Sequence, residues 1–151
     1  MTRVFRVVLF SLSLVVFLLL GVFFLLVPAI SYYDHQYAQL DVYSHVEREE
    51  ALILTQNLVD YLWWKDHLLS SWNEKERAHM MDVRQLFDLA RLVLVIAFLN
   101  SLLLLGLSRE RSVLLRRGAR IGFVFVVVLG LIILLWFSSL FTFFHLISFS
   151  N

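Results

Sequence analysis

The sequence contains no cysteine and only one proline, Pro28. Without cysteine, the chain has no thiol nucleophile, no disulfide, no cysteine-ligated zinc site and no iron–sulfur cluster. It also lacks the Gly-rich phosphate loop that ends in Lys-Ser/Thr and the Gly-x-Ser-x-Gly turn of serine hydrolases. These absences exclude cysteine chemistry and give no support to nucleotide binding or to a hydrolase of that type.

Charged residues are almost absent from three long stretches of the chain. Residues 7–27 carry no charge over 21 positions, residues 92–107 carry none over 16, and residues 121–147 carry one ionisable side chain over 27. A helix needs about 20 apolar residues to cross a bilayer, and 60% of this chain is hydrophobic. We therefore expect an all-α integral membrane bundle of three transmembrane helices in a single domain, 1–151.

The second stretch is shorter than a full span, so its helix is expected to continue toward Val83. There Arg84, Asp88 and Arg91 follow one another at helical spacing and partly neutralise each other. The first stretch is longer than a signal-peptide core of about 7–15 residues, and no small-residue cleavage site follows it. It is therefore expected to be an uncleaved anchor that ends in a kink at Pro28.

The distribution of arginine predicts the orientation in the membrane. Arg3 and Arg6 precede the first span, and five arginines lie in the loop 108–120 against one acid, Glu110. The segment 31–85 instead carries ten acids and five bases. By the positive-inside rule, the N-terminus and the loop are cytoplasmic, whereas residues 31–85 and the C-terminus lie outside. Membrane topology and anionic lipid account for the arginines, so no nucleic-acid partner is expected. The expected spans are residues 7–30, 86–107 and 121–147.

Residues 31–85 are expected to be helical and partly amphipathic. Ser44 and Glu47 have the spacing of a capping box, and the apolar and acidic residues after them predict an amphipathic helix of about 18 residues. The aromatic run 61–64 suits either the headgroup zone of the outer leaflet or packing against the spans. Asn73 is expected to cap a second helix, which continues without a break through the second span.

One face of this second helix carries the most suggestive residues. At 100° per residue, His79, Asp82, Leu86, Ala90, Ala97 and Asn100 lie in a single stripe. Small residues allow helices to approach closely, and amides join helices within a membrane. We therefore expect this stripe to face the bundle rather than lipid.

His79 and His145 are expected to reach similar depths at the outer interface. His79 stands about 42 Å above Leu107, and His145 stands about 36 Å above Ile121 if its helix is unbroken. Histidine changes charge near neutral pH, and Asp82 is placed to orient the ring of His79. These three residues are the candidate site.

Ordinary roles also remain open for these residues. A His-x-x-Asp pair on a helix is common, and His145 lies among phenylalanines that suit an interfacial anchor. The other histidines, His35, His45 and His67, are expected to be solvated. A metal site formed by His79, Asp82 and His145 lacks both the His-Glu-x-x-His spacing and a fourth ligand, so neither a metal nor a cofactor is expected.

Two strings resemble a known family. Residues 72–87 (WNEKERAHMMDVRQLF) contain His-Met-x-Asp-Val, a basic residue and Leu-Phe, and residues 144–151 (FHLISFSN) contain Phe-His followed by Phe and a small polar residue. Both are similar to motifs of small bacterial integral membrane proteins that include the lipoprotein intramolecular transacylase. Residues 43–62 also resemble the outer amphipathic segment of that family. The family pattern continues into a Trp-containing segment and a fourth span, whereas this sequence ends at Asn151.

The resemblance implies an enzyme of the bacterial cytoplasmic membrane whose active site lies at the outer leaflet. Its substrate is a lipoprotein with a diacylglyceryl group on the N-terminal cysteine, and it moves the sn-2 acyl chain to the α-amino group of that cysteine. His79 is then the general base, oriented by Asp82, and His145 stabilises the oxyanion or protonates the departing glyceryl oxygen. Two alternatives are a non-catalytic membrane partner of envelope or lipoprotein-processing proteins and a metal-dependent membrane hydrolase.

Overall fold

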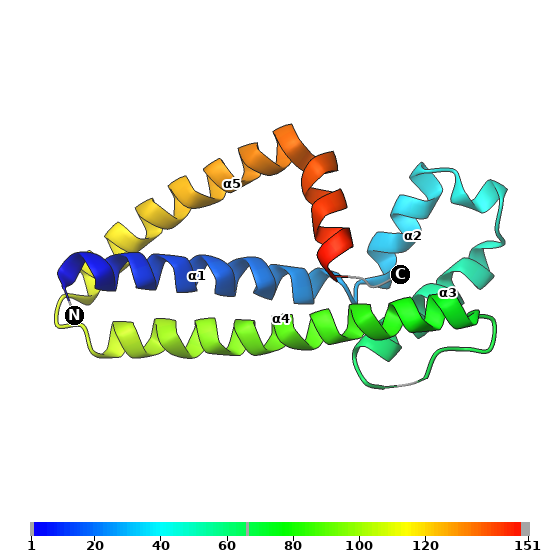
Figure 1. Ribbon diagram of the computed structural model, residues 1–151, viewed down its shortest axis with the longest axis horizontal. Helices are drawn as coiled ribbons and strands as arrows, with labels where there is room; N and C mark the ends of the chain where they lie inside the picture. Colours follow the sequence, from blue (N-terminus) through cyan, green and yellow to red (C-terminus); the bar gives the residue numbers. More distant parts are fainter. Residues whose placement is uncertain (1, 66, 149–151) are drawn as a thin grey trace. The chain divides into compact units, whose positions relative to one another are not determined.

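The computed structural model describes residues 2–65 and 67–148. All regular structure there is helical, and none of these residues forms a strand. The elements are α1 (Arg3–Leu26), α2 (Ile30–Gln39), the 3-10 helix η1 (Val42–Ser44), α3 (Arg48–Leu62), α4 (Glu74–Gly106) and α5 (Arg111–Ser148) (Figure 1). The all-α class expected from the sequence is confirmed.

Three helices, α1, α4 and α5, are long and apolar enough to cross a membrane. Each coincides with one of the three uncharged stretches. Helix α1 ends at Leu26, two residues before Pro28, and the chain resumes a helix at Ile30. The proline therefore lies between two helices, because its ring and its missing N–H do not suit a helix interior.

The chain forms two compact units. One comprises the described residues of 1–20 and 88–151, and we call it the apolar unit; the other comprises residues 21–87, and we call it the polar unit. Helices α1 and α4 each contribute to both. The polar unit contains His79 and Asp82, and the apolar unit contains His145.

The core of the apolar unit lies where α1 meets the end of α4 and the start of α5. It is made of Val7, Phe10, Leu104 and Leu114. Two glycines of α5 allow its backbone to approach α1. A Cβ atom on Gly118 would lie 2.6 Å from the ring of Phe10, and one on Gly122 would lie 2.8 Å from Val15. Close approach through small residues is a common way for helices to pack in membranes.

The lower part of the predicted α4 stripe packs as expected. Ala97 is buried, and the Asn100 side-chain amide donates a hydrogen bond of 2.6 Å to the Ser13 hydroxyl of α1. Ser101 and Leu104 are buried on the same side of the bundle. This face of α4 therefore contacts α1, as the small residues and the amide predicted.

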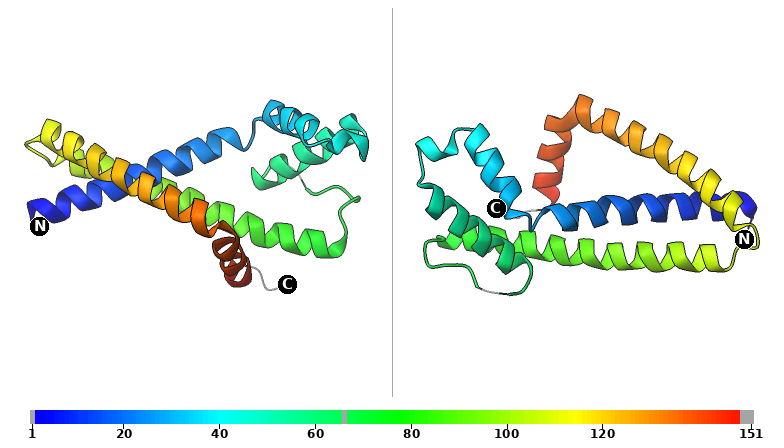
Figure 2. Two further views of the ribbon diagram at one scale, coloured as in Figure 1. Left: turned by 90° about the horizontal axis from the view of Figure 1, so that it is seen from above. Right: turned by 180° about the vertical axis from the view of Figure 1, so that it is seen from behind.

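Helix α5 is not straight. Trp136 has φ −123° and ψ 23°, which are not helical values, and Figures 1 and 2 show the resulting bend. Helix α5 is therefore interrupted, whereas the height expected for His145 assumed an unbroken helix, so the similar depths of His79 and His145 stay a prediction. Along most of α5 the apolar side chains are exposed within the chain, as lipid contact requires.

In the polar unit, α2 packs against α3 and η1. Helix α2, which consists mostly of tyrosine and polar residues, was not expected as a separate element. Helix α3 begins later than the sequence predicted. The Ser44 hydroxyl donates to the Asp41 carbonyl, and Glu47 occupies the position before α3 without a capping hydrogen bond. The expected capping box is therefore absent, and α3 has 15 residues rather than about 18.

Candidate functional site

The start of α4 is held by a reciprocal pair of hydrogen bonds. The Glu76 N–H donates to the Asn73 side-chain oxygen over 2.9 Å, and the Asn73 N–H donates to the Glu76 carboxylate over 2.8 Å. The predicted Asn73 cap is confirmed, and Glu76 completes a capping box. The backbone is therefore well defined one turn before His79.

The loop before α4 is anchored by the buried side chain of Asn57 on α3. Its amide donates to the His67 carbonyl over 2.9 Å. Its oxygen accepts from the Leu69 N–H over 3.1 Å and from the Trp72 indole over 3.2 Å. Sequence reasoning missed this residue, although an amide on the buried face of an amphipathic helix is a recognisable signal.

Arg77 anchors the same loop from α4. Its Nε donates to the Trp72 carbonyl over 2.8 Å, and its terminal nitrogen donates to the carbonyls of Leu68 and Leu69. Backbone carbonyls of loop residues have no partner in a helix or strand, so they need such donors when they are sheltered from water. Asn57 and Arg77 together fix the approach of the chain to the first turn of α4.

His79 and Asp82 lie one helical turn apart on α4, and both are half-buried. A half-buried imidazole is sheltered from bulk water but open to a substrate. The structure thus places the pair on a rigid helix, close after a well-anchored start. A direct contact between Asp82 and His79 stays a prediction.

Arg84 connects this part of α4 to the end of α3. Its guanidinium lies 3.2 Å from the centre of the Trp64 ring and 4.5 Å from the centre of the Tyr61 ring. Such cation–π contacts stabilise by about 0.5–2 kcal/mol, depending on desolvation. Of the expected charge ladder formed by Arg84, Asp88 and Arg91, the pair Asp88–Arg91 is present at 2.6 Å. The Arg84 guanidinium instead packs on aromatic rings.

An aromatic cluster packs beside this contact. Phe87, the last residue of the first motif, lies 6.0 Å from the Trp63 ring and 5.9 Å from the Phe24 ring, centre to centre. Tyr61 and Leu62 are buried in the same region. Of the two alternatives for the aromatic run 61–64, these contacts support packing against the ends of α1 and α4.

An apolar cavity of about 320 Å³ lies between α2 and α3 in the polar unit. Its wall includes Val27, Leu54, Leu58 and Val59, and the Tyr37 hydroxyl at its edge is hydrogen-bonded to Thr55 over 2.9 Å. Because Thr55 itself donates to the Ala51 carbonyl, these polar groups are satisfied within the protein. The cavity therefore offers a mostly apolar surface, of a size typical of ligand pockets.

Helices α2 and α3, which form this cavity, are tied together by Asp34. Its carboxylate accepts two hydrogen bonds from Arg48, at 2.9 and 2.6 Å, and one from the Tyr43 hydroxyl at 2.7 Å. Hydrogen bonding from Arg48 first, and from Tyr43 second, lowers the pKa of Asp34 from 3.8 to about 2. The pKa of Tyr43 is raised by burial and by its bond to this carboxylate.

His145 lies nine residues beyond the bend of α5, in the apolar unit. Its ring is exposed and stacks on Phe141, with centroids 6.0 Å apart and planes 19° apart. His145 and His79 belong to different units, so their convergence stays a prediction. The remainder of the second motif, Phe149, Ser150 and Asn151, lies outside the described residues.

His35, His45 and His67 have exposed side chains, as predicted. Within residues 2–65 and 67–148, no three His, Asp or Glu side chains lie together in a way that can hold a metal ion.

The family of the chain follows from its match over residues 7–151 to the family described as lipoprotein intramolecular transacylase, Lit. The chain belongs to the Lit family. No curated protein and no solved structure matches it. The family resemblance inferred from the two motifs is thereby confirmed.

Membership in the Lit family indicates the general activity of the chain. The family description indicates a transacylase that acts on lipoproteins. The stretch 72–87 that carries the first motif begins at the indole bound by Asn57 and ends at Phe87 of the aromatic cluster. Its Asn73, Arg77, Arg84 and Phe87 side chains make the contacts described above, and His79 and Asp82 lie between Arg77 and Arg84 on the same helix.

Proposed function

We propose that this protein moves the sn-2 acyl chain of a diacylglyceryl lipoprotein to the α-amino group of the lipoprotein's own N-terminal cysteine. The products are an N-acylated cysteine and a lyso-glyceryl group. The observation that carries the proposal is the Lit family match across residues 7–151, which includes the anchored α4 turn with His79 and Asp82.

The reaction needs no nucleophile from the protein. The nitrogen lone pair of the substrate amine attacks the ester carbonyl carbon, and the amine loses a proton. The bond from that carbon to the glyceryl oxygen then breaks, and the oxygen gains a proton. Because the amine and the ester belong to one substrate molecule, the protein must mainly hold them in a reactive geometry, which can contribute about 7–11 kcal/mol.

We assign the proton transfer to the two motif histidines. His79 accepts the amine proton, and Asp82 orients its ring and stabilises the imidazolium. His145 donates a hydrogen bond to the developing oxyanion or a proton to the glyceryl oxygen. The bend at Trp136 redirects the last turns of α5, and this assignment requires that they bring His145 to the substrate bound at His79.

We assign the apolar cavity between α2 and α3 to an acyl chain of the substrate. The cavity lies in the same unit as His79, and its polar groups are satisfied internally. An alkyl chain loses contact with water there and displaces no required hydrogen bond, which favours binding by about 0.8 kcal/mol for each buried methylene.

We also propose that this chemistry takes place at the outer leaflet of a bacterial cytoplasmic membrane. The arginines precede α1 and lie between α4 and α5, whereas residues 31–85 are acidic. The positive-inside rule then places the polar unit on the outer side, where diacylglyceryl lipoproteins are anchored by their lipid.

The experiment is to express His79→Ala and His145→Ala variants in cells that lack other lipoprotein N-acylation and to analyse a lipoprotein N-terminus by mass spectrometry. We expect each substitution to lower conversion by about 10²–10⁴-fold, the usual contribution of a general acid or base. His35→Ala, which removes an exposed histidine of α2, is the matched control.

Conversion by His79→Ala at the unmutated rate would rule out its role as the base, and the same result for His145→Ala would rule out the second role. If the unmutated chain leaves the acylation state unchanged, the proposed reaction itself is wrong. Loss of activity in His35→Ala as well would mean that the effect is structural.

A further inference from the structure

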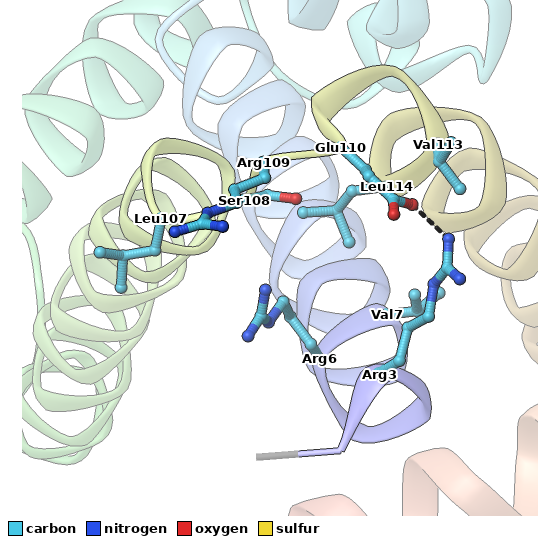
Figure 3. A pocket seen from close by; sticks show the side chains of 9 residues that line it. All are labelled: Arg3, Arg6, Val7, Leu107, Ser108, Arg109, Glu110, Val113 and Leu114. Atoms are coloured by element: carbon cyan, nitrogen blue, oxygen red, sulfur yellow. Dashed lines mark hydrogen bonds and ion pairs between the residues drawn. The ribbon is translucent and has the colours of Figure 1, made fainter.

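The apolar unit contains a pocket of about 430 Å³ at the junction between α4 and α5 (Figure 3). Arg3 and Arg6 enter it from the first turn of α1, and Arg109 and Glu110 enter it from the loop. The buried Ser108 and the core residues Val7 and Leu114 also line it. The pocket therefore has both charged and apolar walls.

The charge of this pocket is strongly positive. Arg3 forms an ion pair with Glu110, which is the one acid between residues 92 and 148. Among the described residues, Arg6 and Arg109 form no ion pair with a carboxylate. The site thus holds one neutralised arginine and two arginines whose charge is available to an anion.

A second, apolar groove of about 270 Å³ adjoins the pocket, with Arg3 and Val7 in both walls. It runs between α1 and α5 over Val4, Val8 and Ile121, which are exposed. Two further arginines, Arg117 and Arg120, stand along its edge. Next to Arg117 in the sequence, Gly118 lets α5 approach Phe10 of α1 closely.

We propose that the pocket and groove together bind an anionic phospholipid of the bilayer. The phosphate of the headgroup accepts hydrogen bonds from Arg6 and Arg109, and one acyl chain lies along Val4, Val8 and Ile121. The two halves of the site favour different chemical groups: the pocket favours an anion, and the groove favours an alkyl chain. Both are parts of one phospholipid, and arginines near a membrane surface attract anionic lipid.

This lipid site is distinct from the acyl-transfer site. It lies at the Gly106 end of α4, whereas His79 lies at the other end of the same 33-residue helix. Under the orientation proposed above, it faces the cytoplasmic leaflet. The lipid then clamps α1 to the loop that joins α4 and α5, in a place where the protein alone provides one ion pair and a small core.

The test uses the full chain in nanodiscs that contain phosphatidylglycerol and phosphatidylcholine in equal amounts. After extraction, native mass spectrometry measures which lipid remains bound. We expect retained phosphatidylglycerol at a stoichiometry near one, with selectivity reduced about 25-fold in Arg6→Gln/Arg109→Gln, since each arginine near a membrane surface contributes about fivefold. Arg111→Gln/Arg116→Gln removes the same amount of charge from the start of α5, where neither side chain lines the pocket or the groove, and it should retain the selectivity.

Equal retention of both lipids by the unmutated chain would overturn the proposal. This outcome does not depend on whether a variant folds. Equal loss in the two double variants would also overturn it, because net charge alone would then explain binding. If millimolar inorganic phosphate raises the unfolding temperature as much as phosphatidylglycerol does, the groove plays no part and the lipid assignment is wrong.

Discussion

In the polar unit, side chains distant in the sequence meet through hydrogen bonds, as Asn57 does with the loop before α4 and Asp34 does with Arg48. In the apolar unit, α1, α4 and α5 meet mainly through small residues and aliphatic side chains. There, a hydrogen bond between the side chains of Asn100 and Ser13 links α4 to α1.

This difference follows from the surroundings that each unit needs. Irregular loops must satisfy their backbone groups with specific partners, and Asn57 and Arg77 provide such partners for residues 67–72. Helices satisfy their own backbone, and in a membrane they associate by close packing. The proposed pair, His79 and Asp82, lies in the unit with the first kind of environment, which suits a geometry that must be held within about 0.5 Å.

The largest expected effect comes from breaking the polar unit at Asn57. Asn57→Leu keeps the volume but leaves the His67 carbonyl, the Leu69 N–H and the Trp72 indole without their partner. We expect a loss of stability on the order of 3 kcal/mol, because unsatisfied sheltered groups cost about 1–3 kcal/mol each. Thermal unfolding in detergent and hydrogen exchange of residues 67–73 measure it.

The control for Asn57 is its neighbour Gln56, an exposed amide that bonds only to Asp60 in the described part of the chain. Gln56→Leu should leave the exchange of the loop unchanged. If the loop amides exchange as slowly in Asn57→Leu as in the unmutated protein, the Asn57 side chain does not hold the loop. The contrast between the units is then weaker than described.

A smaller effect is expected from a single methyl group in the apolar unit. In Gly118→Ala, the new Cβ meets the fully buried Phe10 ring at 2.6 Å, and overpacking of this kind costs about 1–3 kcal/mol. In Gly130→Ala on the same helix, nothing lies within 4 Å, and the gain in helix propensity is up to about 1 kcal/mol. The two substitutions should therefore shift the unfolding temperature in opposite directions.

If Gly118→Ala stabilises the protein as Gly130→Ala does, α5 does not approach α1 as closely as described. The comparison is informative because both substitutions change the same residue type on α5 and differ only in what the added carbon touches.

The smallest effect concerns pH. The folded-state pKa of Asp34, about 2, lies below its ordinary value of 3.8 because Arg48 and then Tyr43 donate hydrogen bonds to the carboxylate. A lowered pKa stabilises the fold above the ordinary value, and this contribution is lost as pH falls from about 4 toward 2. Unfolding temperatures measured across that range should fall more in the unmutated protein than in Asp34→Asn.

Asp41→Asn is the control for this pH dependence, since Asp41 is exposed and adopts a left-handed conformation that asparagine tolerates. It should retain the dependence seen in the unmutated protein. An identical acid response in Asp34→Asn and the unmutated chain would show that the link between α2 and α3 does not rest on this carboxylate.

The predictions that succeeded concern features that depend on neighbouring residues. Asn73 and Glu76 are three residues apart, so their capping box can be recognised locally. Ala97 and Asn100 lie on one helical face, so their contact with a neighbouring helix follows from periodicity. The predictions that failed concern residues for which a contact with a distant residue competes with the interaction that the local pattern favours.

At Ser44, the interaction favoured by the local pattern does not form. Its spacing to Glu47 suits a capping box, but Ser44 ends the 3-10 helix η1 and its hydroxyl donates to the Asp41 carbonyl. Helix α3 begins only at Arg48, which pairs with Asp34 of α2. Arg84 has acidic neighbours on its own helix, yet its guanidinium rests on Trp64 and Tyr61. The local sequence around Arg48 and Arg84 does not reveal these distant partners.

The sequence by itself determined the three long apolar helices, the cap at Asn73, the stripe on α4 and the family motifs, because each is written in residues within a few turns of one another. Only the tertiary structure decided how the loop before α4 is held, which rings receive Arg84 and where α5 bends. These features arise from contacts between residues far apart in the chain, and their energies depend on distances that no local pattern encodes.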